Sequence, residues 1–169
     1  MIVLRTERLI LRHLTPEDAP FIFELVNDPS WIRFIGDRFV RTLDDAGRYI
    51  RTAYLGEYAK LGFGMYLTEH KDTGVAMGMC GLIKRDTLED VDIGFAFLPR
   101  YGAQGFALEA ASAVLAQARD VLGLERLVAI TTPDNGPSRR LLEKLGMRLE
   151  RMLPPSDDPE ELCLYSIDF

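Results

Sequence analysis

Apolar and polar residues follow two different periods along this chain, and the two periods predict different elements. Seven stretches are short, apolar or alternating, and rich in β-branched and aromatic residues, which is typical of strands. They are 3–12, 63–69, 75–84, 89–98, 126–131, 147–153 and 162–168. Other stretches repeat apolar residues every three or four positions, as one face of a helix does. They are 16–26, 42–60, 105–121 and 135–145.

The ends of the predicted helices carry residues that satisfy unpaired backbone groups. Thr15 and Thr42 are suitable N-caps, and Pro16 fits the first position of a helix. The run Asn27-Asp28-Pro29 is expected to end the first helix. Residues 31–39 are then expected to form an aromatic, glycine-containing connector without regular structure.

Strands precede the helices and interleave with them, so the predicted fold class is mixed α/β (α+β), with helices on both faces of one sheet. The length of 169 residues fits one domain, and no linker, internal repeat or low-complexity tract divides it. We therefore expect a single domain over 1–169. It should contain a mostly antiparallel sheet of about six to seven strands and about four helices.

Composition excludes several classes of partner. The net charge of −6 argues against nucleic acid, which needs a basic face. Cys80 and Cys163 lie in apolar runs and are expected to be small buried side chains. His13 and His70 are isolated, so no metal site is expected. No apolar run approaches the length of a membrane span, so no membrane partner is expected. The N-terminus lacks a signal-peptide core, so secretion is not expected either. The expected location is cytoplasmic.

A glycine-rich junction joins the strand at 89–98 to the helix at 105–121, and reads R-Y-G-A-Q-G-F-A-L-E-A-A over 100–111. Such a junction gathers backbone N–H groups and the positive end of a helix dipole, which favours an anion such as pyrophosphate. The dinucleotide pattern G-x-G-x-x-G near the first strand and the Walker-type Lys-Ser/Thr are both missing. Taken alone, the junction fits a glycine turn needed for packing equally well.

A second motif, T-T-P-D-N-G-P-S-R-R-L-L-E-K-L-G-M over 131–147, follows a predicted buried strand and opens a helix. Its residues have plausible local roles. Asn135 is an N-cap, Ser138 a first-turn residue that bonds the local backbone, and Gly146 a helix-ending glycine. These local roles are compatible with a further role in binding.

The two motifs, in this order and at this separation, resemble the GNAT superfamily of N-acetyltransferases. T-E-R-L-I-L-R (6–12), P-E-D-A (16–19) and D-I-G-F (92–95) are similar to its Rim-type branch, which acetylates the N-termini of ribosomal proteins. The resemblance covers nearly the whole chain. It implies acetyl-CoA as co-substrate, a primary amine as acceptor, and a splayed pair of strands, here 91–98 and 127–131.

The resemblance also implies which residues bind acetyl-CoA. Pantetheine would bond the backbone in the gap between the splayed strands, and the pyrophosphate would lie on the N–H groups of the glycine-rich turn. The implied residues are Phe97, Leu98, Gly102, Ala103, Gln104, Gly105, Phe106, Ala107, Asn135 and Ser138. Gly102 stands where the family usually has Arg or Gln, so Arg100 is expected to supply the missing charge.

Amide formation needs a neutral amine and a stabilised thiolate. Asp92, early in the strand beside the gap, is the first candidate for the base, ahead of Glu89 and Asp90. Leu142 stands where many relatives have a Tyr acid, and the resemblance gives that role to Ser138 instead. Two simpler interpretations stay open, in which Asp92 is a salt-bridged strand carboxylate and Ser138 is only a capping residue.

The acceptor pocket is expected among aromatic side chains, which could instead belong to the hydrophobic core. Trp31 and Phe34 are the first candidates for substrate binding, followed by Tyr54 and Phe63. Asp37 and Arg38 could meet the charges of a substrate. The sequence does not separate a protein N-terminus from an amino sugar, a polyamine or a small amino acid.

The predicted function is acetyl-CoA-dependent N-acetyl transfer to a primary amine, by direct attack through a tetrahedral intermediate. The acceptor expected from the resemblance is a protein N-terminus, and the alternative is a small amine or an aminoglycoside. A CoA-binding module without catalysis is the alternative from a different class. A homodimer is plausible for the family, although no exposed apolar stripe marks its interface.

Overall fold

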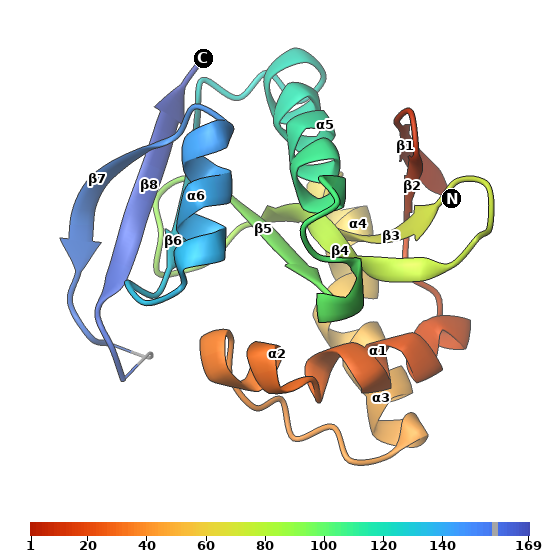
Figure 1. Ribbon diagram of the computed structural model, residues 1–169. Helices are drawn as coiled ribbons and strands as arrows, with labels where there is room; N and C mark the ends of the chain where they lie inside the picture. Colours follow the sequence, from red (N-terminus) through yellow and green to blue (C-terminus); the bar gives the residue numbers. More distant parts are fainter. Residues whose placement is uncertain (157–158) are drawn as a thin grey trace.

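The computed structural model describes residues 1–156 and 159–169. In this part of the chain eight strands form one sheet, in the order β1-β2-β3-β4-β5-β6-β8-β7 (Figure 1). The strands are β1 (Ile2–Arg5), β2 (Leu9–Arg12), β3 (Met65–His70), β4 (Ala76–Ile83), β5 (Asp92–Phe97), β6 (Arg126–Thr131), β7 (Arg148–Leu153) and β8 (Leu162–Asp168). Neighbouring strands are antiparallel except β5 and β6, which are parallel.

Helices cover both faces of the sheet. They are α1 (Ala19–Val26), α2 (Pro29–Phe34), α3 (Leu43–Ile50), α4 (Gly56–Leu61), α5 (Phe106–Asp120) and α6 (Gly136–Lys144), with short turns η1 (Pro16–Asp18), η2 (Arg51–Leu55) and η3 (Pro99–Tyr101). Figure 1 shows α5 and α6 on one face and α1, α2 and α3 on the other.

The hydrophobic core has two layers, one on each face of the sheet. Tyr66 and Cys80 pack in the layer beneath α5, whereas their neighbours Leu67 and Met79 pack against α1 and α3. Successive side chains of a strand point to opposite faces, so β3 and β4 supply both layers. None of the helices within the described ranges combines the length and apolar composition needed to cross a membrane.

The predicted fold class is confirmed, with a small difference in the number of strands. The stretch predicted as one strand, 3–12, forms the hairpin of β1 and β2. Thr6 closes its turn, because Thr6 N donates to Leu9 O at 2.9 Å and Leu9 N donates to Thr6 Oγ1 at 3.0 Å. This turn contains no glycine, proline or asparagine, so the sequence pattern did not indicate it.

A second difference lies in the segment predicted as an irregular connector. Pro29 to Phe34 form helix α2, because Asp28 Oδ1 accepts a hydrogen bond from Ser30 N at 2.9 Å and so caps a new helix. The helix predicted from Thr42 is present, and Thr42 Oγ1 accepts from Asp45 N at 3.0 Å. It continues through the π-helical turn η2 into α4.

Candidate active site

Strands β5 and β6 separate from each other shortly after they meet. They pair only where Asp92 lies opposite Val128, and Val128 N donates to Val91 O at 3.1 Å. Beyond this point β5 stays paired with β4 and β6 stays paired with β8. The two strands therefore form the splayed pair that the sequence resemblance implied, with a gap between their carboxyl ends.

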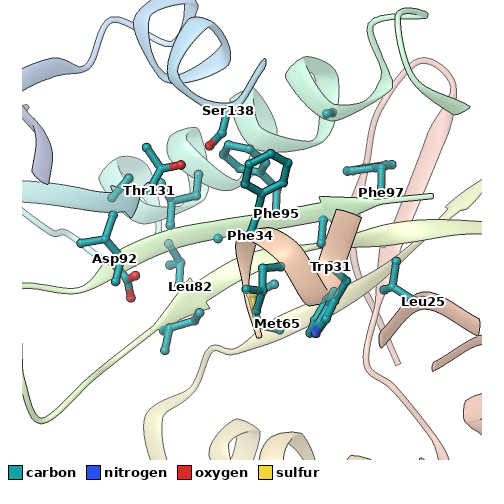
Figure 2. A pocket seen from close by; sticks show the side chains of 18 of the residues that line it. Leu25, Trp31, Phe34, Met65, Leu82, Asp92, Phe95, Phe97, Thr131 and Ser138 are labelled. Carbon is teal, nitrogen blue, oxygen red and sulfur yellow. The ribbon is translucent and has the colours of Figure 1, made fainter. Parts of the chain in front are cut away.

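The gap opens into a cavity of about 550 Å³, which is within the usual range for small-molecule sites (Figure 2). The predicted site residues that line it are Trp31, Phe34, Asp92, Phe97, Ala107, Asn135 and Ser138. The remaining predicted cofactor residues, Leu98, Gly102, Ala103, Gln104, Gly105 and Phe106, lie outside its lining. All of these except Leu98 belong to the exposed turn before α5 and its first residue.

The backbone of β5 offers hydrogen bonds to the gap at every second residue. Leu98 N donates to Met77 O on β4 at 3.0 Å, and Leu98 O accepts from Tyr101 N, so the Leu98 backbone is already bonded. Because alternate residues of a strand bond to opposite sides, Phe95 and Phe97 direct their N–H and C=O groups into the gap. Phe97 is therefore suited to bond pantetheine, whereas Leu98 contributes a buried side chain.

The glycine-rich turn presents a row of unpaired donors. Ala103 and Gly105 both have left-handed backbone conformations, with φ values of 57° and 79°. The backbone N–H groups of residues 103–108 have no acceptor within the described part of the chain. A turn of this kind, leading directly into the 15-residue helix α5, is suited to bind an anion.

A network from the β1–β2 hairpin holds this turn in place. Glu109 Oε1 accepts from Thr6 Oγ1 at 2.6 Å and from Arg8 N at 2.8 Å, and its Oε2 accepts from Arg8 Nε at 2.7 Å. Arg8 Nη1 also donates to Gln104 O at 2.9 Å. Burial raises the pKa of Glu109, but the bonds from Thr6 and Arg8 outweigh it and keep the pKa below its usual value.

The structure corrects the expectation for Arg100. Its guanidinium pairs with Glu24 and lies 5.0 Å from the centroid of the Tyr101 ring. Arg8 is the arginine that contacts the turn, through the Gln104 carbonyl. The sequence suggested Arg100 because it lies near Gly102 in the chain, whereas Arg8 reaches the turn from almost a hundred residues away.

Asp92 lies where the two strands part, and only 1% of its surface is exposed. Its Oδ2 accepts from Arg85 Nε at 3.1 Å, and its Oδ1 has no hydrogen-bond partner among the described residues. Burial raises the pKa of Asp92, and Arg85 only partly opposes the shift. The other two candidates for the base, Glu89 and Asp90, line a separate, smaller cavity, where Asp90 pairs with Arg126.

Ser138 lies in the first turn of α6. Its N–H donates to Asn135 Oδ1 at 3.3 Å, so Asn135 is the N-cap, and its hydroxyl has no partner in the described ranges. Phe95 and Phe97 belong to the core layer beneath α5 and α6, so Asp92, which alternates with them, faces the α1–α4 side. Figure 2 accordingly shows Ser138 and the Asp92 carboxylate on opposite sides of the β5 ribbon.

The α1–α4 side of the cavity contains residues that the sequence analysis missed. The helix formed by α3, η2 and α4 contributes Tyr49, Ala53, Glu57 and Leu61 to the lining. Their four-residue spacing places them on one face of the helix, and the sequence analysis did not assign this face to the site. Arg38 lines the cavity as expected, whereas Asp37 is bonded to Arg41 at 2.6 Å and Phe63 lies outside the lining.

Neither cysteine belongs to the cavity, since Cys80 and Cys163 are buried elsewhere and unpaired. Burial raises the pKa of the Cys80 thiol far above its usual range. Across residues 1–156 and 159–169, no group of three or more His, Cys, Asp or Glu side chains is arranged to hold a metal ion. The polar side chains that line the gap include Asp92 and Ser138.

The sequence profile of the acetyltransferase (GNAT) domain matches residues 8–148. The chain therefore belongs to the GNAT acetyltransferase family. It is an N-acetyltransferase that uses acetyl-CoA as co-substrate and an amine as acceptor. YoaA of Bacillus subtilis, an uncharacterized N-acetyltransferase, is 31% identical over 98% of this chain and 96% of its own length. YnaD of the same organism is 30% identical over 86% and 82%.

Solved structures share this fold. The acetyltransferase from Agrobacterium tumefaciens is 28% identical and superposes with a TM-score of 0.83, covering 98% of this chain and 94% of its own. RimL, the ribosomal L7/L12 α-N-protein acetyltransferase in complex with CoA, superposes with a TM-score of 0.85 at 16% identity, over 100% and 98%. The likeness to RimL is thus one of fold.

Proposed function

We propose that this N-acetyltransferase works by direct attack of a primary amine on the thioester of acetyl-CoA, with Asp92 as base and Ser138 as hydrogen-bond donor to the leaving sulfur. One observation carries the proposal. Asp92, with its unpartnered Oδ1, and Ser138 both line the cavity at the gap between β5 and β6, on opposite faces of the sheet. An amine and a thioester that met in this gap would each find the group they need.

The described residues fit acetyl-CoA along one continuous path. The unpaired N–H groups of residues 103–108 suit the pyrophosphate, and the Phe97 backbone suits an extended pantetheine, which would bind as an added strand does. Asn135 and Ala107 lie between these two ends, in the cavity wall. This path places the thioester beside Phe95, whose N–H is directed into the gap and suits the oxyanion.

The reaction balances without a covalent enzyme intermediate. The amine nitrogen forms a bond to the thioester carbon, the carbon–sulfur bond breaks, and Asp92 accepts the proton that the amine loses. Ser138 donates a hydrogen bond to the departing sulfur, a modest demand because a thiol has a pKa of about 8.5. The burial that raises the pKa of Asp92 makes it a stronger base than an exposed aspartate.

The acceptor approaches from the α1–α4 side, where Trp31 and Phe34 form part of the wall. An aromatic-walled cavity favours a small amine as the acceptor. A protein N-terminus is the second candidate, and the Rim-like motifs of the sequence favour it. The single domain over 1–169 and the homodimer remain predictions.

Acetyl-CoA titration followed by a thiol-release assay over a panel of amines tests the proposal. We expect Ser138→Ala to lower kcat roughly a hundredfold, the lower range of acid–base effects, while acetyl-CoA affinity stays unchanged. Ser112→Ala, on the exposed face of α5, is the matched control. Saturable binding without transfer to any amine would instead favour a CoA-binding module without catalysis.

A further inference from the structure

Two charged side chains in the cavity wall have no partner within the described ranges. The charged lining residues are Arg38, Glu57, Lys84, Arg85 and Asp92. Arg85 pairs with Asp92 at 3.1 Å, and Lys84 Nζ donates to the backbone oxygens of Arg85 and Leu88 at 3.0 and 2.5 Å. Arg38 and Glu57 form neither a hydrogen bond nor an ion pair in residues 1–156 and 159–169, so both charges are available to a ligand.

The loop between α2 and α3 carries Arg38, which lines the cavity. Asp37, the residue before it, holds this loop, since its Oδ1 accepts from Phe39 N at 2.8 Å and its two oxygens pair with Arg41. Tyr49 and Tyr54 line the same cavity, so the guanidinium and the two phenols belong to one lining.

The π-helical turn η2 adds a further donor to this lining. Tyr49 and Tyr54 are five residues apart, and the Tyr54 hydroxyl donates to the Tyr49 hydroxyl at 3.1 Å, with the rings in an edge-to-face arrangement. Tyr49 keeps its own O–H hydrogen free for a ligand. Glu57 follows Tyr54 by three residues, almost one helical turn, and is half-buried. The cavity lining thus combines a guanidinium, a phenol donor and a carboxylate.

Most of the other residues in the cavity lining are apolar. Trp31, Phe34 and Met65 are among them, and Figure 2 shows all three beside the β5 strand. Trp31 is 7% exposed, and its indole N–H has no partner among the described residues. A ligand that fills this space needs an apolar stem between two polar ends.

We infer that the acceptor is a free α,ω-diamino acid, which is acetylated on its distal amine. A guanidinium with a phenol donor recognises the α-carboxylate, and the carboxylate of Glu57 recognises the α-ammonium. The methylene stem would lie along the apolar wall, and the distal amine would reach Asp92. The inference rests on the proposed function, because it assumes transfer in the gap between β5 and β6. The products are the Nω-acetyl amino acid and CoA.

Steady-state thiol release tests the inference with four amines that differ in one group at a time. L-Lysine carries both α-groups, cadaverine lacks the carboxylate, and 6-aminohexanoate lacks the α-ammonium. A short peptide with a free N-terminus and no lysine represents the second candidate for the acceptor. We expect kcat/KM to be highest for lysine, by roughly tenfold or more over each analogue, since each lost contact is a charge-assisted bond.

Two variants assign each contact to a side chain. Arg38→Gln is expected to raise KM for lysine roughly ten- to a hundredfold and to leave KM for cadaverine unchanged. Glu57→Gln is expected to raise KM for lysine and leave KM for 6-aminohexanoate unchanged. Arg51→Gln and Asp44→Asn, exposed residues outside the cavity wall, are the matched controls.

The outcomes separate this inference from the proposed function. Preference for the peptide or for cadaverine, or equal effects of each variant on all four amines, would overturn the diamino acid and leave acetyl transfer intact. Absence of transfer to every amine, with acetyl-CoA still bound, would overturn the proposed function itself. Preference for lysine that disappears selectively in the two variants would support both.

Discussion

Asp92 shows most clearly how a single residue can be unfavourable for the fold and useful for the reaction. A carboxylate with 1% of its surface exposed and one oxygen unpartnered is costly to keep charged. Arg85, whose side chain is 37% exposed, compensates for only part of this cost. The remaining cost appears as the raised pKa of Asp92. In the proposed mechanism, Asp92 is also the group that must accept a proton.

We expect Asp92→Asn to abolish measurable acetyl transfer while acetyl-CoA still binds, because asparagine keeps the shape of the site but accepts no proton. The acid limb of kcat/KM against pH in the wild type should lie above the usual pKa of an aspartate, since the pKa of Asp92 is raised. A pH profile of kcat/KM for the amine, with acetyl-CoA saturating, checks this. A wild-type acid limb at the ordinary aspartate value would rule out Asp92 as the base.

Asp92→Asn should lose activity, but its stability relative to the wild type should increase as pH rises. A carboxyl with a pKa raised by folding contributes stability below its unfolded pKa, and that contribution is lost as pH rises through the folded value. Asp92→Asn has no such loss, so its melting temperature relative to the wild type should rise between pH 4 and pH 7. A constant difference across that range would contradict the buried-charge argument.

Residue-level predictions from the sequence succeeded where the hydrogen-bond partner lies a few residues away in the chain. Asn135 was predicted as an N-cap and caps α6, and Thr42 caps α3. They failed where the partner is distant in the chain. Arg100 was assigned to the turn because it is nearby in sequence, but it pairs with Glu24, and Arg8 reaches the turn instead. A single sequence carries no signal for contacts of that separation.

At the scale of elements, α5 and the turn before it together form the predicted anion site. The turn needs two left-handed residues, and glycine supplies only one of them, since Ala103 also has a positive φ of 57°. Left-handed alanine costs roughly 1–2 kcal/mol, so the surrounding contacts must maintain this strained conformation. Its retention at the predicted anion site is consistent with a binding role for the unpaired N–H groups.

Ala107→Glu should remove acetyl-CoA binding without unfolding α5. A carboxylate at this position would repel the pyrophosphate, yet acidic residues in a first turn stabilise a helix by roughly 0.3–1 kcal/mol. Ser112→Glu, farther along the exposed face of the same helix, is the control. Calorimetric titration with CoA and thermal unfolding measure the two effects. Unchanged CoA affinity in Ala107→Glu would mean that the turn does not hold the pyrophosphate.

The elements that the sequence mispredicted have two different physical causes. Asp28-Pro29 was interpreted as the end of a helix, but it also begins α2, because an N-cap followed by proline serves both purposes. The hairpin at Thr6 was missed because side-chain bonds, one of them to Glu109, replace the usual turn residues. Long periodic stretches such as α5, β6 and β8 were predicted within one or two residues.

Across the whole molecule, ion pairs join segments about a hundred residues apart around the cavity. Arg33 of α2 pairs with Asp134, in the loop between β6 and α6, at 3.2 Å. Both side chains are more than half exposed, so the pair should contribute little to global stability. It nevertheless links the helix that carries Trp31 and Phe34 to the loop that carries Asn135, and so spans the two sides of the site.

We expect Arg33→Gln to raise KM for the acceptor severalfold and to leave the free energy of unfolding within about 0.5 kcal/mol of the wild type. Acetyl-CoA affinity should not change, because the turn before α5 is held separately. High salt should raise KM in the wild type and have a smaller effect in the variant, since salt screens exposed pairs. Equal salt sensitivity in both proteins would show that the pair does not position α2.

Glu109 joins the N-terminal hairpin to the acetyl-CoA side of the molecule, so its loss should affect both stability and binding. Glu109→Gln keeps the shape but removes the charge that accepts from Thr6 and Arg8, and should cost about 1–2 kcal/mol of unfolding free energy at pH 7. CoA affinity should fall as well, because Arg8 would no longer be held against Gln104. Chemical denaturation and CoA titration measure the two losses.

The pH dependence distinguishes this explanation from a simple packing defect. Folding lowers the pKa of Glu109, so its contribution is present above the unfolded value and is lost as pH falls through the folded value. The stability difference between wild type and Glu109→Gln should therefore shrink as pH falls from 7 toward 4, whereas Glu125→Gln, an exposed control, should show little difference at either pH. A Glu109→Gln deficit that stays constant with pH would mean that shape, not charge, holds the hairpin against α5.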